Sequence, residues 1–258
     1  MGSSAPRAAR ELKGVILAGG TGSRLQPLTQ VTNKHLLPVY DRPMIHYGVE
    51  QFAASGISRI MIVTGGNDAG EFLRILGNGA SFGLQHLDYT YQERAGGIAE
   101  ALGLCEWFAD GGPIVVLLGD NIFERSVAPI VERFRRRPTG ARIVLASVED
   151  PRAYGVAEMD GDRLVRIVEK PQQPPSHLAV TGLYFYDNRV FDMVRMLTPS
   201  HRGELEITDV NNRYLELGEL THELTDGFWA DCGESFDSLL RAGTLVATRG
   251  ANRPPAAG

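Results

Sequence analysis

The chain has 258 residues, 43% of them hydrophobic, which is enough to bury the core of one large α/β domain. Its formal net charge of −5 is close to balance and argues against bulk attraction to nucleic acid or to a membrane surface. No window approaches the roughly 18 consecutive apolar residues of a membrane span. Two cysteines, Cys105 and Cys232, are too few for a disulfide framework or a metal cluster, so a cytoplasmic enzyme is expected.

The two ends of the chain are expected to lie outside the folded unit. Residues 1–12 lack the apolar stretch of a secretory signal and are interpreted as a disordered leader. Residues 250–258 are rich in Pro, Ala and Gly and are expected to form a flexible tail. One domain is therefore expected over residues 13–249.

The pattern of apolar residues, glycines and prolines predicts alternating strands and helices in the first half of the chain. The expected elements are strands over 15–18, 59–63, 87–91 and 113–118, and helices over 43–55, 69–76, 98–109 and 127–137. The second half is expected to contain strands over 142–147, 156–158, 164–168, 178–186, 222–224 and 228–230, and helices over 190–196, 207–217 and 235–249. This order predicts an α/β, Rossmann-like domain with a mostly parallel mixed central sheet flanked by helices.

The most informative stretch runs from Gly14 to Pro38. Its apolar start leads into Gly19-Gly20-Thr21-Gly22-Ser23-Arg24, where glycines can adopt φ > 0 and successive N–H groups can bind an anion. Arg24 adds a guanidinium suited to phosphate, and Lys34 follows ten residues later. We therefore expect a loop that binds a polyphosphate, with Lys34 as a second cation.

Two other classes of glycine loop do not fit this stretch. A dinucleotide-binding G-x-G-x-x-G pattern fails because Gly20 and Gly22 are followed by Leu25. The acidic residue that should end the next strand is also missing, since residues 60–63 lead into Thr64. A P-loop fails because the chain has no Gly-Lys-Ser/Thr. A dinucleotide-dependent oxidoreductase is therefore disfavoured.

Two carboxylates follow apolar strands, at Asp120 and at Asp231. Ligands bind at the carboxyl edge of open α/β sheets, so these side chains could converge on one Mg²⁺. This ion prefers one or two carboxylates together with substrate phosphates. The alternative for Asp120 is an aspartate that caps a turn.

Lysine is scarce, because the 26 basic residues comprise 23 Arg and only Lys13, Lys34 and Lys170. A lysine is a compact charge that suits a crowded phosphate site. Lys13 is interpreted as chance, whereas Lys34 and Lys170 lie in motif-like segments and are interpreted as functional. The alternative for Glu169-Lys170 is a surface ion pair.

The pattern LAGGxGxRLxPLTxxxxKxLLP, which begins at Leu17, resembles the opening of the sugar-nucleotide pyrophosphorylases. These nucleotidyltransferases join a sugar 1-phosphate to a nucleoside triphosphate. LGDNIF, EKP, AVTGLYFYDN, RGELEITD and WADCG also resemble family segments, so the resemblance spans roughly residues 13–249. It implies a nucleotide-diphospho-sugar transferase domain with a nucleotide-binding part over about 13–125 and a sugar-binding part over about 140–235.

For the nucleotide, the resemblance implies contacts from Leu17, Gly19, Gly20, Thr21, Gly22, Ser23, His35, Gln92 and Gly97. The amide of Gln92 would read a pyrimidine base through one donor and one acceptor. His35 stands where many thymidylyltransferases carry Gln. Its ring is either a hydrogen-bond donor to the nucleotide or a packed structural residue.

For the sugar phosphate, the resemblance implies contacts from Tyr154, Gly155, Glu169, Val180 and Thr181, with Thr181 offering its hydroxyl. The implied catalytic cations are Arg24, Lys34 and Lys170, and the implied Mg²⁺ ligands are Asp120 and Asp231. Arg202 is expected to contact phosphate or to close the site, whereas Glu206 and Asp209 are expected to cap and stabilise the helix that follows. Cys232, where the family usually has Thr, is interpreted as a tolerated small residue, with a reactive thiol as the alternative.

The expected reaction is in-line attack of glucose 1-phosphate on the α-phosphorus of dTTP, giving dTDP-glucose and pyrophosphate. The alternatives are a sister transferase that uses UTP or GTP with another hexose 1-phosphate, and a catalytically silent nucleotide-sugar sensor on the same fold. The resemblance also implies a homo-oligomer, either a tetramer or a dimer. Longer family members carry a C-terminal helical extension that forms a regulatory site, so end-product inhibition is expected to be missing or altered here.

Overall fold

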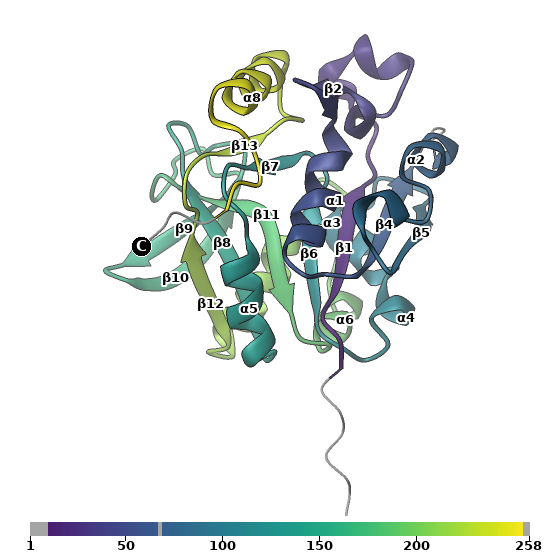
Figure 1. Ribbon diagram of the computed structural model, residues 1–258. Helices are drawn as coiled ribbons and strands as arrows, with labels where there is room; N and C mark the ends of the chain where they lie inside the picture. Colours follow the sequence, from purple (N-terminus) through teal and green to yellow (C-terminus); the bar gives the residue numbers. More distant parts are fainter. Residues whose placement is uncertain (1–9, 67–68, 255–258) are drawn as a thin grey trace, which may run out of the picture.

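The computed structural model describes residues 10–66 and 69–254 (Figure 1). The strands of its main sheet are β1 (Lys13–Ala18), β4 (Arg59–Gly65), β5 (His86–Gln92), β6 (Ile114–Leu118), β8 (Ala141–Ser147), β9 (Gly155–Asp160), β10 (Arg163–Glu169), β11 (Leu178–Tyr186) and β12 (Leu220–Leu224). Two small sheets pair β2 (Pro38–Val39) with β3 (Arg42–Pro43), and β7 (Asn121–Phe123) with β13 (Trp229–Asp231).

The main sheet is mixed, and its parallel pairs come from the first half of the chain except for β8 with β12. The strand order is β10-β9-β11-β6-β1-β4-β5, with β8 beside β11 and β12 beside β8. β1 pairs in parallel with β4 and β6, and β4 pairs in parallel with β5. β11 is antiparallel to β6, β8 and β9. The predicted α/β fold with a mixed central sheet flanked by helices is confirmed.

The helices are α1 (Met44–Ala54), α2 (Ala69–Leu76), α3 (Ile98–Gly103), α4 (Glu106–Ala109), α5 (Ala128–Arg136), α6 (Val190–Arg195), α7 (Ile207–Glu216) and α8 (Phe236–Arg249). The prediction of one helix over 98–109 is wrong, because α3 ends at Gly103 and α4 begins three residues later. Glycine favours helix less than other residues do except proline. The side chain of Val194 also lies close, 3.2 Å from where a Cβ on Gly103 would be.

β1 lies near the centre of the sheet and is buried on both faces (Figure 1). Val15 and Leu17 belong to the hydrophobic cluster on one face, and Ile16 and Ala18 belong to the cluster on the other. Successive side chains of a strand point to opposite faces, so a continuous apolar run suits a strand that is covered on both sides.

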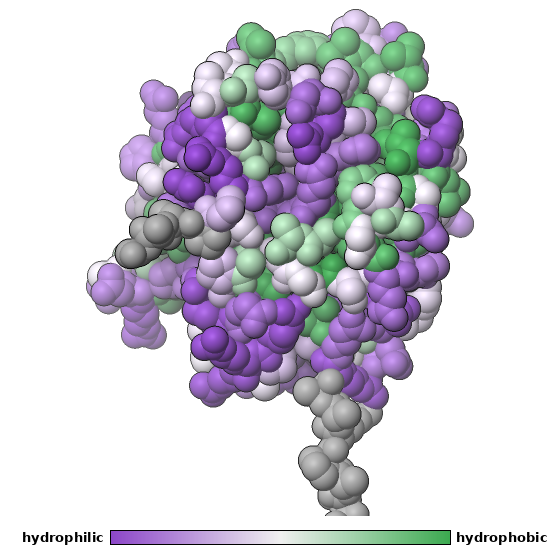
Figure 2. All heavy atoms as spheres, viewed as in Figure 1, coloured by the Kyte–Doolittle hydropathy of each residue, from purple (hydrophilic) through white to green (hydrophobic). Residues whose placement is uncertain are grey.

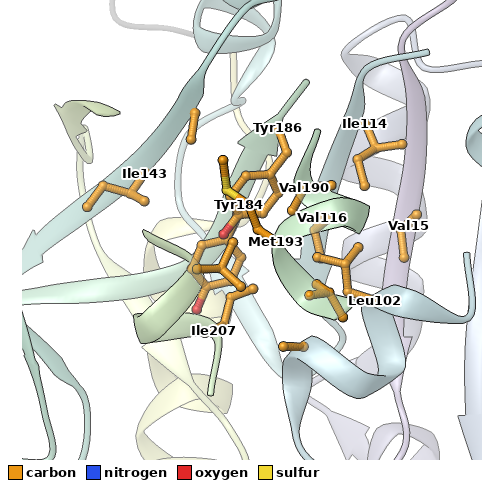
Figure 3. Close-up of a cluster of buried hydrophobic side chains, with 14 of the residues drawn as sticks. Val15, Leu102, Ile114, Val116, Ile143, Tyr184, Tyr186, Val190, Met193 and Ile207 are labelled. Atoms are coloured by element: carbon orange, nitrogen blue, oxygen red, sulfur yellow. The ribbon is translucent and has the colours of Figure 1, made fainter. Parts of the chain in front are cut away.

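Figure 3 shows part of the first hydrophobic cluster, where Tyr184 and Tyr186 of β11 lie beside Val116 of β6 and near Ile207 at the start of α7. The rings of the two tyrosines are stacked, with centroids 6.2 Å apart and an interplanar angle of 12°. This cluster fixes α7, which forms a wall of the candidate site, against the sheet.

α8 covers β2 and β13 at one end of the molecule (Figure 1). Residues 250–254, which were expected to begin a flexible tail, instead lie along β7. The N–H groups of Asn252 and Arg253 donate to the carbonyls of Phe123 and Glu124 at 3.0 and 2.8 Å. The expectation of a disordered leader over 1–12 is also wrong at its end, because Leu12 is buried in the second hydrophobic cluster. The other residues of the expected leader and tail, 1–9 and 255–258, lie outside the described residues.

The surface view mixes charged, polar and apolar side chains, and apolar residues gather along the upper rim, where α8 and β2 lie (Figure 2). Tyr40, Phe236 and Leu240 are exposed. Among the described residues, no helix has the length and apolar character needed to cross a membrane.

Candidate active site

The glycine-rich loop follows β1 and lies at the same sheet edge as the ends of β4, β5 and β6. It borders a cavity of about 370 Å³. The residues expected to contact the nucleotide all line this cavity, and four charged residues join them: Leu17, Gly19, Gly20, Thr21, Gly22, Ser23, His35, Gln92, Gly97, Arg24, Lys34, Asp120 and Glu204. The loop and Lys34 therefore meet in space, as expected from the carboxyl edge of a parallel sheet.

The loop requires glycine at Gly20 and Gly22. Both residues have positive φ, at 97° and 61°. A Cβ on Gly22 would also lie 2.8 Å from the methyl group of Thr29, whose hydroxyl donates to the Gly22 carbonyl. A side chain at Gly22 would therefore meet both backbone strain and a direct clash.

Lys34 and Asp120 form a largely buried ion pair. Lys34 Nζ donates to Asp120 Oδ2 at 2.5 Å, and Asn121 Nδ2 donates to Asp120 Oδ1 at 2.9 Å. Burial alone would lower the pKa of Lys34, but the Asp120 carboxylate outweighs burial and raises it. Burial likewise opposes ionisation of Asp120, yet Lys34 and His35 hold its pKa well below the usual range. Both partners are therefore charged at neutral pH.

Asp231 is brought to Asp120 by the small β7–β13 sheet. Its register sets Asp231 opposite Asn121, and the Cys232 N–H donates to the Asp120 carbonyl at 2.8 Å. Burial and the charge of Asp120 together raise the pKa of Asp231 to about 7. Asp120 is buried and Asp231 is half-buried. Two neighbouring carboxylates in such surroundings repel each other, and a cation between them would remove that cost.

This donor set fits a hard divalent cation that takes oxygen ligands. Within residues 10–66 and 69–254, no cluster of three or more His, Cys, Asp or Glu side chains could hold a metal. A cation at Asp120 and Asp231 would therefore need further oxygens from a substrate or from water. Mg²⁺ commonly binds through such a combination of one or two carboxylates and substrate phosphates.

A second cavity of about 160 Å³ lies on the other side of this carboxylate pair. Of the residues expected to bind the sugar phosphate, Tyr154, Glu169, Lys170 and Val180 line it, together with Asp231, Trp229 and residues of α7. Gly155 lies next to this group, since a Cβ there would be 3.2 Å from Thr208 Oγ1 and 3.5 Å from Glu169 Oε2.

The two cavities share part of their lining, including Arg24 and Glu204. Arg24 Nη1 donates to Glu234 Oε2 at 2.6 Å, so a phosphate group that binds Arg24 would compete with this carboxylate. Lys34 lines the first cavity and Lys170 the second. The arrangement can hold two phosphorylated ligands side by side with a cation on each side.

Two segments far apart in the sequence are joined beside both cavities. Leu205 N–H donates to the Gly96 carbonyl at 2.8 Å, and Ala99 N–H donates to the Leu205 carbonyl at 3.2 Å. Gly97, between them, has φ of 100°, and a Cβ there would lie 2.5 Å from the Leu205 carbonyl oxygen. Only glycine allows this close contact.

Lys170 has a strained backbone, with φ of 41° and a proline after it. Its N–H donates to the Tyr154 carbonyl at 3.0 Å. A residue other than glycine seldom adopts a left-handed conformation, and such strain persists where the surrounding structure enforces it, often at functional sites. The β9–β10 hairpin therefore holds Lys170 in an enforced position at the cavity.

The residues around Arg202 correct one expectation. Glu206 is the residue before the first turn of α7, but its side chain makes no capping hydrogen bond. It accepts from Arg202 Nη2 at 2.8 Å instead, and the same guanidinium lies 3.6 Å from Glu169. Arg202 lines the second cavity. The guanidinium supplies five donors and so outcompetes the backbone N–H groups for this carboxylate.

Thr181 does not offer its hydroxyl to the second cavity, contrary to the sequence-based expectation. The hydroxyl donates to the Val144 carbonyl at 2.9 Å, and the residue is fully buried. The reason is the alternation of β11, which turns Val180, Gly182 and Tyr184 toward the cavity and Thr181 to the opposite face.

Of the two roles considered for His35, the structure favours a packed structural residue over a hydrogen-bond donor to the nucleotide. Its Nδ1 lies 2.8 Å from Asn33 Oδ1, and burial lowers its pKa to about 3, so the ring is neutral. An amide oxygen only accepts, so the ring proton sits on Nδ1. The ring still borders the first cavity.

Part of the hydrogen-bonding capacity of Gln92 is already used within the protein, because its Nε2 donates to Glu100 at 3.1 Å.

Asn211 and Glu204 also contribute to the second cavity, and the sequence-based reasoning missed both. Asn211 lies on the face of α7 that also buries Val210 and Tyr214. A polar residue at a core position of an amphipathic helix is the signal that could have revealed it, because such residues are costly unless they are satisfied or functional.

The chain belongs to the nucleotidyl transferase family, which matches residues 13–249. Two curated relatives, from an Actinoplanes strain and from Neisseria gonorrhoeae, are both named glucose-1-phosphate thymidylyltransferase. The first is 44% identical and aligns with 88% of this chain and 76% of its own length. The second is 43% identical and aligns with 92% of this chain and 83% of its own length.

Solved structures agree with the assignment of the chain to this family. A Bacillus anthracis protein assigned as a glucose-1-phosphate thymidylyltransferase, in complex with a sucrose, superposes with a TM-score of 0.88 at 49% identity, covering 92% of this chain and 96% of its own. A UDP-glucose pyrophosphorylase complexed with UDP-glucose has a TM-score of 0.78 at 22% identity, over 92% of this chain and 99% of its own. The second likeness concerns the fold alone.

Proposed function

We propose that this protein transfers a thymidylyl group from dTTP to glucose 1-phosphate, giving dTDP-glucose and pyrophosphate. The observation that carries the proposal is the pair of adjoining cavities, with Lys34 on one side, Lys170 on the other and two carboxylates between them. Relatives at 42–44% identity that are named for this activity support the choice of substrates.

The chemistry is positioning together with charge neutralisation. A phosphate oxygen of the sugar attacks the α-phosphorus in line, the bond from that phosphorus to the bridging oxygen breaks, and pyrophosphate leaves. Lys170 holds the attacking phosphate, and the loop with Arg24 holds the β- and γ-phosphates. Lys34 neutralises charge near the reacting centre. These groups are fixed before the reaction, which is why they stabilise the transition state.

Asp120 and Asp231 would hold Mg²⁺, which would supply further charge neutralisation for the phosphates. Occupancy of this site would also relieve the repulsion that raises the pKa of Asp231 to about 7.

We also propose, from the resemblance to the family alone, that the enzyme acts in the cytoplasm as a homo-oligomer, either a tetramer or a dimer. Light scattering on the purified protein would test the assembly.

A sister transferase that uses UTP or GTP with another hexose 1-phosphate is the alternative. Gln92 at the first cavity favours a pyrimidine, because its amide can match the edge of that base. His35, in place of the Gln of many thymidylyltransferases, leaves the choice between dTTP and UTP as the point to measure.

The test is pyrophosphate release with glucose 1-phosphate and Mg²⁺, run in parallel with dTTP, UTP and GTP, with Asp120→Asn as the control variant. Release with dTTP that the variant loses supports the proposal. A preference for UTP or GTP keeps the mechanism and overturns the base assignment. Nucleotide binding with no release from any triphosphate means that the protein is a sensor and not an enzyme.

A further inference from the structure

One amide in the wall of the second cavity has unused hydrogen-bonding capacity. Asn211 lies on α7 and is only 1% exposed, yet it contributes to the lining of this cavity. Its Oδ1 accepts from the Tyr186 hydroxyl at 2.6 Å. Its Nδ2 has no hydrogen-bond partner within the described part of the chain.

A buried N–H₂ group without partners is unusual, because the group has lost its water and gained nothing in return. In the structure the Tyr186 hydroxyl donates to Oδ1, which leaves the Nδ2 end of the amide free. The free end therefore carries two donors, and a ligand in the cavity is the natural acceptor.

The neighbouring Asn212 shows what a purely structural asparagine looks like on the same helix. Its Oδ1 accepts from the Ile167 N–H and its Nδ2 donates to the Ile167 carbonyl, both at 2.9 Å. That amide is satisfied by β10 and joins α7 to the sheet. Asn211, one residue earlier, is satisfied only at its Oδ1 end.

The surroundings of Asn211 match a hydroxyl group. Glu169 lines the same cavity and accepts a hydrogen bond from Thr208, which lies three residues before Asn211 on α7. A sugar hydroxyl both donates and accepts, so it can accept from an amide and donate to a carboxylate. An anionic phosphate is better served by Lys170 and Arg202 of the same cavity.

We propose that Asn211 is a specificity residue of the sugar site, and that its Nδ2 donates to a hydroxyl of the hexose. The proposal rests on the proposed function, because it takes the second cavity as the hexose site. Tyr186 is a positioning residue for this contact, since it holds the amide by Oδ1. A site that donates to a substrate hydroxyl discriminates against sugars that lack it, because the donor is then left buried and unpaired.

The experiment measures the Kd of dTDP-glucose and of dTDP by calorimetry, so that their ratio reports the glucosyl contacts without turnover. Asn211→Leu removes the donor at similar volume, and Asn211→Asp keeps the shape and the acceptor for Tyr186. Each variant should weaken dTDP-glucose about tenfold and leave dTDP within about twofold, as for the loss of one hydrogen bond. Asn212→Leu is the matched control and should lower the melting temperature without changing the ratio of the two Kd values.

Monodeoxy glucose 1-phosphates identify the hydroxyl. The wild type should lose kcat/KM with one of them by about tenfold, and Asn211→Asp should show no such loss with the same analogue. An unchanged ratio of Kd values in both Asn211 variants overturns the proposal, as does an equal loss of dTDP and dTDP-glucose. If Asn211→Leu does not fold, the ratio of the two Kd values in Asn211→Asp alone decides whether the proposal stands. A wild type that binds dTDP-glucose no more tightly than dTDP, or that makes no dTDP-glucose, overturns the proposed function itself.

Discussion

Lys34 and Asp120 lie 86 residues apart in the sequence, and their side chains meet at 2.5 Å with 18% and 11% of their surfaces exposed. Lys34 follows the glycine loop, whereas Asp120 follows β6. The contact therefore connects the glycine-rich loop, which is the proposed polyphosphate site, to the proposed cation site. A pair this buried holds its charges only because each partner compensates the other.

This pair predicts a coupled loss of stability. Lys34→Met leaves Asp120 buried without its cation and should lower the free energy of unfolding by about 3 kcal/mol. Lys34→Met with Asp120→Asn should lose less than the sum of the two single changes, because the uncompensated charge is gone. Urea denaturation measures the free energy of unfolding of the wild type, of the two single variants and of the double variant. Arg74→Met, which breaks the exposed pair with Glu71, is the control and should cost less than about 1 kcal/mol.

Lys170→Ala should lower kcat/KM for pyrophosphate release by at least about a hundredfold, because several kcal/mol of transition-state stabilisation would be lost. The control is Arg163→Ala, which removes an exposed cation at the start of β10, the strand that Lys170 directly follows. It should leave the rate within a few-fold of the wild type. A Lys170→Ala enzyme that is equally active would remove Lys170 from the mechanism.

Gly97→Ala should raise the KM for dTTP by about tenfold or more, because the new Cβ meets the Leu205 carbonyl and pushes the two joined segments apart. Gly203→Ala separates this effect from backbone strain. Gly203 also has positive φ, at 75°, but a Cβ there meets nothing within 4 Å. The positive φ alone should cost each variant roughly 1–3 kcal/mol of stability, and the clash adds to this cost in Gly97→Ala. An equal rise in KM in both variants would contradict the prediction.

Both cysteines should resist thiol reagents in the native protein. Cys105 and Cys232 are fully buried, and burial raises the pKa of each thiol well above its ordinary value. The thiolate is the reactive form, so neither residue should react at pH 8 until the chain is unfolded. Titration with a chromogenic disulfide before and after adding guanidinium measures this. Fast labelling of Cys232 with loss of activity would show instead that it is a reactive group.

The elements of the sheet could be predicted because their signals are local. The apolar run of β1 ends at glycines, and Asp160-Gly161 marks the hairpin between β9 and β10. The break between α3 and α4 could not be predicted, since Leu102, Cys105 and Phe108 keep helical spacing across it. The contact of Gly103 with Val194 of α6 arises only in the folded molecule.

The candidate site also has features that the local sequence predicts and features that depend on the folded molecule. The loop glycines and the carboxylates after strands follow from residue type and position, and the structure brings them together. The direction of Thr181 depends on the phase of β11, which shifts if the strand is displaced by one residue. The preference of Glu206 for Arg202 over the helix end depends on tertiary geometry that no spacing reveals. Asn211 was missed because half of its hydrogen bonding is made by Tyr186, on a different element.

The backbone pairing of Gly96 with Leu205 has a consequence for how such an enzyme can change its substrates. The bond joins main-chain groups, so apart from the need for glycine at position 97 it does not depend on which side chains lie nearby. Residues of the proposed base site and of the proposed hexose site can be exchanged independently while the spacing of the two cavities is preserved. Divergence in substrate choice can thus proceed by single replacements, provided that the glycine at 97 is retained.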